Sequence, residues 1–505
     1  MSAMQRILGV AVVFALGFGV RAAFDDYRDT EHSRVPVGTR PSAAPVASEP
    51  VLKGDPGLPS APVAELTLYP TVDKGLRTPF DLWRYYGRGR TSFGSPVLPM
   101  RFDQWLAFHE KQKPQLMADV RAYMDARFDL SGAAVPGVTQ SGGKPVMAGP
   151  VARLPDGVPS WEALGELPPE TIREQDLFPF KPLAHPLQST AHMLFPDSWV
   201  AVHPEHARID VDHDIPDAYL PDFPPPMYLT THKELGDVTR GQEVTFDNFH
   251  ALFDGLLTAE QMEGLKELLR PTPTTWFNTT EHRVTVAPSR GVACFDCHVN
   301  GHTNGAVELG PDSRPNLARL RTDTPTMRGN YNLMQLSSKR SIRSMDHFAE
   351  VEEYFDGDPG MQQAIGPRGV KREVTNRMGD FNALLDYPPA PKLGPLGRLI
   401  PSKATAAELR GEALFRGKAR CVQCHDGPAF VDDYMHDLQV ERFYVGRPEG
   451  PIKTFPLRGI KDSPPYLHDG RLLTLDDAVA FFSLVLELHL TEAEQDDLVA
   501  FLLCL

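Results

Sequence analysis

Apolar residues recur at helical spacing in several separate stretches of the chain, and proline- and glycine-rich segments lie between these stretches. Residues 102–128 follow the pattern of one long amphipathic helix, which Pro114 is expected to interrupt because proline lacks a backbone N–H. A Thr-Ala-Glu-Gln sequence starting at Thr258 has the form of a capping box, in which two side chains satisfy backbone N–H groups at a helix start. It predicts a helix that ends near Leu269.

Similar signals appear towards the C-terminus. Capping boxes that start at Thr405 and Thr491 predict two further helices, and residues 475–488 are expected to form a third. Residues 132–230 are instead dense in proline and glycine, so we expect them to form a long, ordered covering loop. The pattern as a whole predicts a mainly α-helical protein with a Pro/Gly-rich, largely irregular N-terminal region.

The first residues indicate an exported protein. Arg6 precedes an apolar run from Ile7 to Val20, which is shorter than the ~20 residues that a membrane-spanning helix needs. Residues 1–22 are therefore expected to be a secretory signal peptide or an N-terminal anchor. Residues 23–69, which are rich in proline and alanine, are expected to be a flexible tether.

Composition narrows the classes of function. A chain of 505 residues is expected to fold into about two to four domains, and a net charge of −15 argues against nucleic-acid binding. Three histidines in a short acidic neighbourhood, His203, His206 and His213, lack a fixed ligand spacing. We expect them to be exposed loop residues and not metal ligands.

Two segments share the pattern Cys-x-x-Cys-His: Cys294, Cys297 and His298 form the first, and Cys421, Cys424 and His425 form the second. This pattern is the requirement for covalent c-type haem attachment, in which both thiols bond to one porphyrin and the histidine becomes the proximal iron ligand. A four-thiolate zinc site would not need the histidines. A thioredoxin-like redox pair would need strand–helix–strand surroundings, which are missing here. The sequence therefore predicts two covalently bound haem c groups.

The two motifs belong to an internal repeat. Arg328 follows the first motif in Thr-Pro-Thr-Met-Arg-Gly, and Arg458 follows the second in Thr-Phe-Pro-Leu-Arg-Gly. At the same offset of 130 residues Asp346 matches Asp476, and each is expected to open a helix. Two copies of one small helical haem module explain these matches.

The expected organisation follows from the repeat. An N-terminal region of unknown role occupies residues 70–285, and two tandem cytochrome c-like domains occupy residues 286–395 and 396–505. The segment that starts at Tyr387 is rich in proline and is expected to link the two domains.

The segment from Thr454 to Leu503 resembles the C-terminal module of the bacterial di-haem cytochrome c peroxidase superfamily. The resemblance is carried by Thr454, Leu457-Arg458-Gly459, Pro465-Tyr466, His468-Asp469-Gly470, Thr474-Leu475 and Ala478-Val479. It covers about 210 residues from Cys294 onward and leaves the first 285 unexplained. The resemblance implies two c-type haems in adjacent helical domains. One would relay electrons, and the other would present an open position to hydrogen peroxide or dioxygen.

The sequence leaves several candidates for the sixth ligand of each haem iron. The relay haem of the peroxidases usually takes a methionine from the helix after the His-Asp-Gly turn, and this chain has Phe482 there. The candidates are His302 and His347 for the first haem and Met435, His436 and His489 for the second.

Three further residues are the expected catalytic groups. Arg328 and Arg458 are expected to bind haem propionates, because a guanidinium matches a carboxylate with two parallel hydrogen bonds. Ordinary ion pairs are the alternative for both. His468 is expected to order the turn beside the second haem, with proton transfer or iron ligation as alternatives.

Three functions are consistent with these features. The first is a periplasmic or otherwise exported oxidoreductase that reduces peroxide with electrons relayed between its haems and supplied by a small redox protein. The second is an electron-transfer cytochrome that docks to another oxidoreductase. The third is a haem oxygenase or maturation enzyme that acts on a polymer or protein. All three exclude nucleic acid as a partner and allow membrane contact only through an N-terminal anchor.

Overall fold

The computed structural model describes residues 102–183, 193–208, 211–271, 293–310, 320–340, 342–348, 372–446 and 448–505. All of them belong to one compact unit, Gly54–Leu505. The expected signal peptide or anchor and the expected tether lie outside the described residues. Among the helices of these ranges, none is long and apolar enough to cross a membrane.

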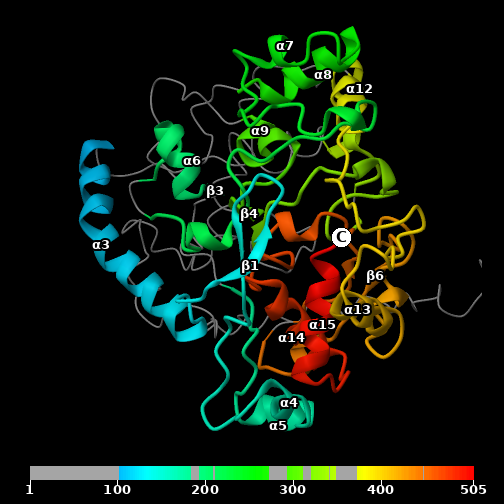
Figure 1. Ribbon diagram of the computed structural model, residues 1–505. Coiled ribbons are helices and arrows are strands. Elements are labelled where there is room, and N and C mark those ends of the chain that lie inside the picture. Colours follow the sequence, from blue (N-terminus) through cyan, green and yellow to red (C-terminus); the bar gives the residue numbers. More distant parts are fainter. Residues whose placement is uncertain are drawn as a thin grey trace, which may run out of the picture. The chain divides into compact units, whose positions relative to one another are not determined.

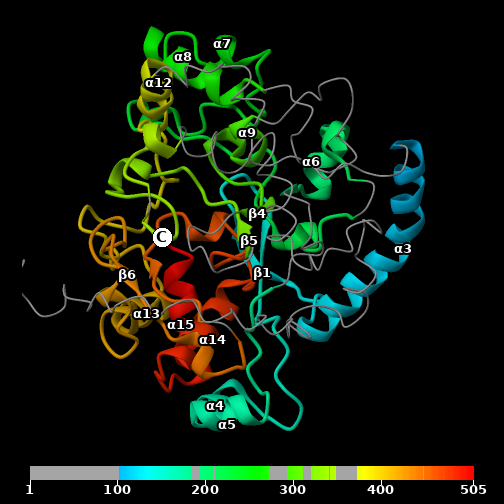
Figure 2. The ribbon, with the colours of Figure 1, turned by 180° about the vertical axis from the view of Figure 1, so that it is seen from behind.

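Helices make up most of the regular structure (Figures 1 and 2). The longer ones are α3 (Phe102–Arg127), α8 (Ala259–Leu269), α12 (Arg372–Asn382), α13 (Ala406–Arg416), α14 (Leu475–Val485) and α15 (Glu492–Leu502). The shorter ones are α4 (Trp161–Gly165), α5 (Pro169–Glu174), α6 (Asp197–Val202), α7 (Phe249–Leu252) and α9 (Cys294–Cys297). The mainly helical class is confirmed, and the division into two tandem domains stays a prediction.

Short antiparallel strands connect the helices. β1 (Ala134–Thr139) and β2 (Pro145–Met147) form a hairpin. A three-stranded sheet has the order β3-β4-β5 and is formed by β3 (Met193–Leu194), β4 (Val307–Gly310) and β5 (Leu320–Asp323). A third pair is β6 (Met435–His436) with β7 (Ile452–Lys453). The expected covering loop therefore contains a hairpin and short helices between its irregular segments.

Local sequence signals account for most helix starts. The three predicted capping boxes, at Thr258, Thr405 and Thr491, are all present, with the side chain of the third residue of each helix bonded back to the threonine N–H. The interruption predicted at Pro114 is wrong, because α3 continues through it. Proline removes only one hydrogen bond from a helix of 26 residues.

The predicted internal repeat is confirmed in the backbone. Isolated β-bridges join Leu336 to Ile342 and Tyr466 to Leu472, which are equivalent positions at the 130-residue offset. Gly329 and Gly459 adopt the left-handed conformation at φ 77° and 74°, and each starts a 3₁₀ turn. The Tyr387 ring packs against Gly329 and the Pro388 ring against Gly459, so the expected linker contacts both turns.

The repeat also includes a pair of packed helices in each copy. Helix α8 packs on α12, and α13 packs on α15. At each crossing the backbones touch at a glycine: a Cβ on Gly264 would collide with the carbonyl oxygen of Arg377, and one on Gly411 with that of Asp497. Because α8 contacts the first motif and α13 contacts the second, we propose that α8 is the counterpart of α13 and that the first module begins near Thr258, before the boundary expected at residue 286.

Two apolar cores surround the two Cys-x-x-Cys-His motifs. One joins α8 and α12 to Phe295 of the first motif. The other joins α13, α14 and α15 to aromatic residues of the N-terminal region. In that second core Phe178 stacks on Phe443 with ring centroids 5.5 Å apart, and Phe180 meets Phe481 edge-on at 5.7 Å. The N-terminal region is therefore part of the core around the second motif.

The start of α14 holds the N-terminal region by carboxylate hydrogen bonds. Asp477 accepts from the N–H groups of Val151 and Ala152 at 3.0 and 2.9 Å. Asp476 accepts from the N–H of Gly149 at 3.2 Å. Burial, followed by the charge of Asp477, raises the pKa of Asp476 to about 7.

The raised pKa of Asp476 predicts that stability falls as pH rises. The ordinary pKa of 3.8 applies to the unfolded chain, so the folded state holds this proton more tightly. The stabilisation of the folded state by this proton is complete below about pH 4 and is lost as pH rises to about 7. Urea unfolding of the full chain across this window checks it. D476N should reduce the slope, whereas D156N, at an exposed turn, should keep it; an unchanged slope in D476N contradicts the assignment.

A second prediction concerns the helix crossings. G264A and G411A should each destabilise the protein by about 2 kcal/mol or more, because the added methyl group forces two backbones apart. G165A is the matched control, since a Cβ at Gly165 meets no atom within 4 Å. Free energies of unfolding for the three variants test this. Equal values for G411A and G165A would show that the crossing tolerates a side chain.

Candidate functional site

The first Cys-x-x-Cys-His motif forms one short helix, α9, and its histidine follows directly. The N–H of His298 donates to the carbonyl of Cys294 at 2.9 Å, which closes the turn. Cys297 is buried, and Nδ1 of His298 is buried without a hydrogen-bond partner. Burial lowers the pKa of His298 to about 4, so the imidazole is neutral. A neutral imidazole is the form that ligates iron.

The second motif repeats this geometry at the end of α13. The N–H of His425 donates to the carbonyl of Cys421, again at 2.9 Å. Nδ1 of His425 donates to the carbonyl of Phe430 at 2.9 Å, which orients the ring and leaves Nε2 as the nitrogen that could ligate a metal. Burial lowers the pKa of His425, against weaker opposing contributions that include the carbonyls of Phe430 and Phe455.

The cysteines and histidines of the two motifs fit two haem c groups better than one metal ion. Within the described ranges, the group of three potential metal ligands whose atoms lie within 4.8 Å of one another is Cys424, Asp432 and His436. The four motif cysteines form no such group, which argues against a four-thiolate zinc site. In a c-type site the sulfur of Cys424 is bonded to the porphyrin and is no longer a thiolate.

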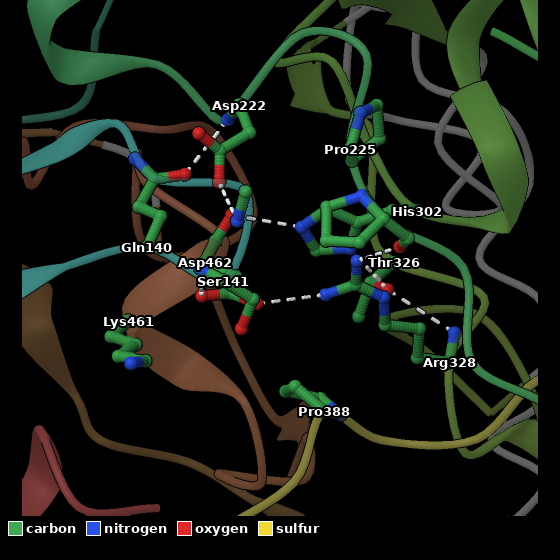
Figure 3. Close-up of polar contacts among 12 residues, drawn as sticks. Gln140, Ser141, Asp222, Pro225, His302, Thr326, Arg328, Pro388, Lys461 and Asp462 are labelled. Carbon is green, nitrogen blue, oxygen red and sulfur yellow. Dashed lines mark hydrogen bonds and ion pairs between the residues drawn. The ribbon is translucent and has the colours of Figure 1, made fainter. Parts of the chain in front are cut away.

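The candidate sixth ligand His302 holds two hydrogen bonds (Figure 3). Its Nε2 lies 2.8 Å from the carbonyl oxygen of Asp462, and its Nδ1 lies 2.7 Å from the hydroxyl of Thr326. Since a carbonyl only accepts, Nε2 carries the proton and Nδ1 accepts from the hydroxyl. Iron ligation by His302 would break one of these bonds, and its ligand role stays a prediction.

The other candidate ligands lie in different environments. Nδ1 of His347 accepts from the N–H of Arg343 at 3.2 Å. His489 is exposed beside Glu166 and lines a cavity of about 90 Å³ with α4 and α14, apart from both motifs. Met435 and His436 lie together on β6, and His436 bonds to Asp432 at 2.7 Å. A ring nitrogen of His436 lies within 4.8 Å of the sulfur of Cys424 in the second motif.

The arginines expected at haem propionates are bound to protein groups. Nη1 of Arg328 donates to Oδ2 of Asp462 at 3.0 Å, and both side chains are 3% exposed. Arg458 donates to the carbonyl oxygens of Leu505 and Pro388, each at 2.9 Å. Both contacts tie segments of the chain together, and propionate binding stays a prediction.

Asp462 is the residue at which three distant segments meet (Figure 3). Oδ1 accepts from the N–H of Ser141 in the β1–β2 hairpin at 2.9 Å, while Oδ2 binds Arg328 and the backbone carbonyl binds His302. The same hairpin is bound by Asp222, whose carboxylate accepts from the Gly142 N–H at 2.7 Å. The sequence offers no signal for Asp462 beyond its place in the repeated turn.

The predicted catalytic His468 lies beside a group of buried charges. Arg471 binds Asp469 at 2.9 Å and Glu449 at 2.8 Å, and Nε2 of His468 lies 4.0 Å from Glu449. Burial is the main reason that the pKa of His468 is lowered. Its carbonyl accepts from the N–H of Asp323 at 2.9 Å, which joins the two repeats.

The histidines expected to be exposed on the N-terminal loop are in fact buried or half-buried. His206 and His213 are inside the protein, and His203 bonds to Glu243 at 2.7 Å. The expectation was wrong because the loop is packed: His213 lies 3.1 Å from the carbonyl of Gly305, and His206 lies near the first motif.

Known proteins resemble part of this chain. The chain is 31% identical over 177 residues to the cytochrome-c peroxidase IdrP2 of Pseudomonas sp. strain SCT, a match that covers 26% of this chain and 48% of the relative. It is 35% identical over 115 residues to the methylamine utilization protein MauG of Methylorubrum extorquens, covering 18% and 33%. The chain thus spans less than half the length of these relatives. No family model matches it.

Among solved structures, a MauG-like protein associated with microbial copper homeostasis aligns at 18% identity and a TM-score of 0.37. That alignment covers 50% of this chain and 90% of the other. The sequence relatives confirm the resemblance to the di-haem cytochrome c peroxidase superfamily.

The buried pair of Arg328 and Asp462 generates a testable prediction. D462N should destabilise the protein by about 3 kcal/mol, because the guanidinium stays buried without its counter-charge. The double variant R328M/D462N should recover part of that loss, which the free energies of unfolding will reveal. D254N, on the surface, is the control. Simple additivity of the two substitutions would contradict a direct interaction.

Proposed function

We propose that this protein is an exported haem-dependent oxidoreductase that carries two covalently bound haem c groups and reduces peroxide. The observation that carries the proposal is the pair of Cys-x-x-Cys-His motifs in equivalent turns, each with a partly buried histidine whose pKa is lowered by desolvation. The similarity to cytochrome-c peroxidases and to MauG supports the same class.

The chain's own residues would hold and orient the two groups. Cys294 and Cys297 would attach one haem and Cys421 and Cys424 the other, with His298 and His425 as proximal ligands. The haem iron supplies the electron-transfer chemistry when bound. The contacts of Asp462 with both repeats keep the two attachment sites in a fixed relation, which a relay of electrons between them requires.

The hydrogen bonds of His302 support an open position at the first haem. Because both ring nitrogens hold hydrogen bonds, to Thr326 and Asp462, ligation of the iron by this histidine would cost one of these bonds. An open position is what peroxide needs, whereas a pure electron-transfer cytochrome fills both axial positions. This favours catalysis over simple electron transfer.

The carboxyl group of Asp323 is suited to proton transfer. Peroxide cleavage needs a group that moves a proton between the two oxygens. Burial, aided by Asp469, raises the pKa of Asp323 well above its ordinary value, against the opposing charge of Arg321. Its Oδ1 is buried without a hydrogen-bond partner. Glu350, Glu352 and Glu353, which follow Asp346 in the sequence, lie outside the described residues.

The remaining parts of the proposal concern location and partners. Covalent haem attachment takes place outside the cytoplasm in c-type cytochromes, and the apolar run at residues 7–20 agrees with export. A small redox protein would supply electrons. Action on a protein substrate is a second candidate, favoured by the match to MauG.

Mass spectrometry and spectroscopy test this proposal on the protein expressed in a host that attaches haem. The wild type should carry two haems, C424A should lose firm attachment of one, and C504A should keep both because Cys504 lies outside the motifs. Electronic absorption and EPR should show a high-spin haem that hydrogen peroxide alters. A chain without added haem, or two low-spin haems that ignore peroxide in every redox state, would contradict the proposal.

A further inference from the structure

A buried tryptophan of the N-terminal region is linked to the first motif by hydrogen-bonding side chains. Trp199, on α6, is 1% exposed, and its indole N–H donates to Nδ1 of His206 at 2.8 Å. Nε2 of His206 lies 3.5 Å from the carboxylate of Asp296, which stands between Cys294 and Cys297. The chain of contacts therefore runs from the indole to the middle of the motif.

The same indole shares an apolar cluster with the motif. Trp199 is grouped there with Phe195, Cys297, Val299 and Ala306. The Phe195 ring stacks on the imidazole of His206 with centroids 4.7 Å apart. Trp161, by contrast, stacks on Phe180 in the other core.

Aromatic stacking continues from the indole towards the surface. The His203 ring lies over Trp199 with centroids 4.0 Å apart and an interplanar angle of 24°. The His203 side chain is 15% exposed and bonds to Glu243 at 2.7 Å. Trp199 therefore lies between a solvent-accessible ring and a haem-attachment cysteine.

This arrangement provides what one-electron oxidation of an indole requires. An indole that loses an electron becomes a strong N–H acid, and a base in contact keeps the proton within reach. Nδ1 of His206 already accepts that hydrogen bond. The carboxylate of Asp296 balances the charge that the imidazole gains, which is effective because the group is buried. Packing alone needs only an acceptor for the indole N–H.

We propose that Trp199 is a one-electron relay between the first haem and a reductant at the His203 surface. This proposal rests on the proposed function. Reduction of hydrogen peroxide to two waters takes two electrons and two protons. Both electrons would come from the external reductant and pass through Trp199 one at a time, and solvent would supply both protons.

The proton of the indole follows a closed cycle. When Trp199 loses its electron, the N–H proton moves to Nδ1 of His206 and leaves a neutral indole radical. One electron from an external donor, such as a small redox protein or ferrocyanide, restores the indole, and the proton returns from His206. A positioning role in the fold alone would generate no radical.

EPR of the haem-loaded protein after mixing with peroxide tests the relay. The wild type should give an organic radical signal that narrows when the protein is grown with ring-deuterated tryptophan. W199F should lose the signal, W199Y should replace it with one that ignores this label, and W161F should keep it. H206Q should change the line shape, because the proton then lacks its base.

A second measurement is independent of peroxide. A flash-generated one-electron oxidant, a ruthenium(III) tris(bipyridine) complex, should oxidise the reduced haem through Trp199. W199F should slow this by at least about tenfold, which corresponds to about 1.4 kcal/mol in the barrier. W161F should not. Haem content by mass spectrometry confirms that each variant is loaded.

The two measurements distinguish failure of the proposed function from failure of the Trp199 relay. If the wild type ignores peroxide but W199F still slows the flash reaction, the proposed function fails and the relay stands. If peroxide is consumed, the radical is not on tryptophan and the flash rates of W199F and wild type are equal, the relay is overturned.

Discussion

The buried ion pair between Arg328 and Asp462 is the interaction on which the rest of this structure depends. Each partner belongs to a different copy of the repeat, and both are almost fully removed from water. Such a pair stabilises a protein little in itself, because desolvation opposes the attraction, but either charge alone would be strongly unfavourable. The consequence of the buried pair is that it specifies one arrangement of the segments that meet there. The hairpin at Ser141 and the imidazole of His302 bind the same aspartate, so three segments meet in one arrangement.

The N-terminal region is consequently part of the site and not a cover over it. Its aromatic side chains complete the core around the second motif, and its backbone N–H groups satisfy the carboxylates at the start of α14. Around the first motif it supplies Trp199 and His206.

Burial also decides the protonation of the groups near both motifs. His298, His302, His425 and His468 all have lowered pKa values, with loss of hydration as the largest cause. Neutral imidazoles next to the motifs are available as ligands or as hydrogen-bonding groups. The same effect raises the pKa values of Asp323 and Asp476.

The sequence by itself determined what depends on residues close together in the chain. Capping boxes need two side chains three positions apart, haem attachment needs five consecutive residues, and the 130-residue repeat was visible as matched short motifs. Only the tertiary structure decided which groups face one another. Asp462 meets Arg328 across 134 positions and His302 across 160, and Asp296 meets His206 from a separate region. No local pattern encodes these contacts, because each arises from packing between elements whose sequences do not refer to one another.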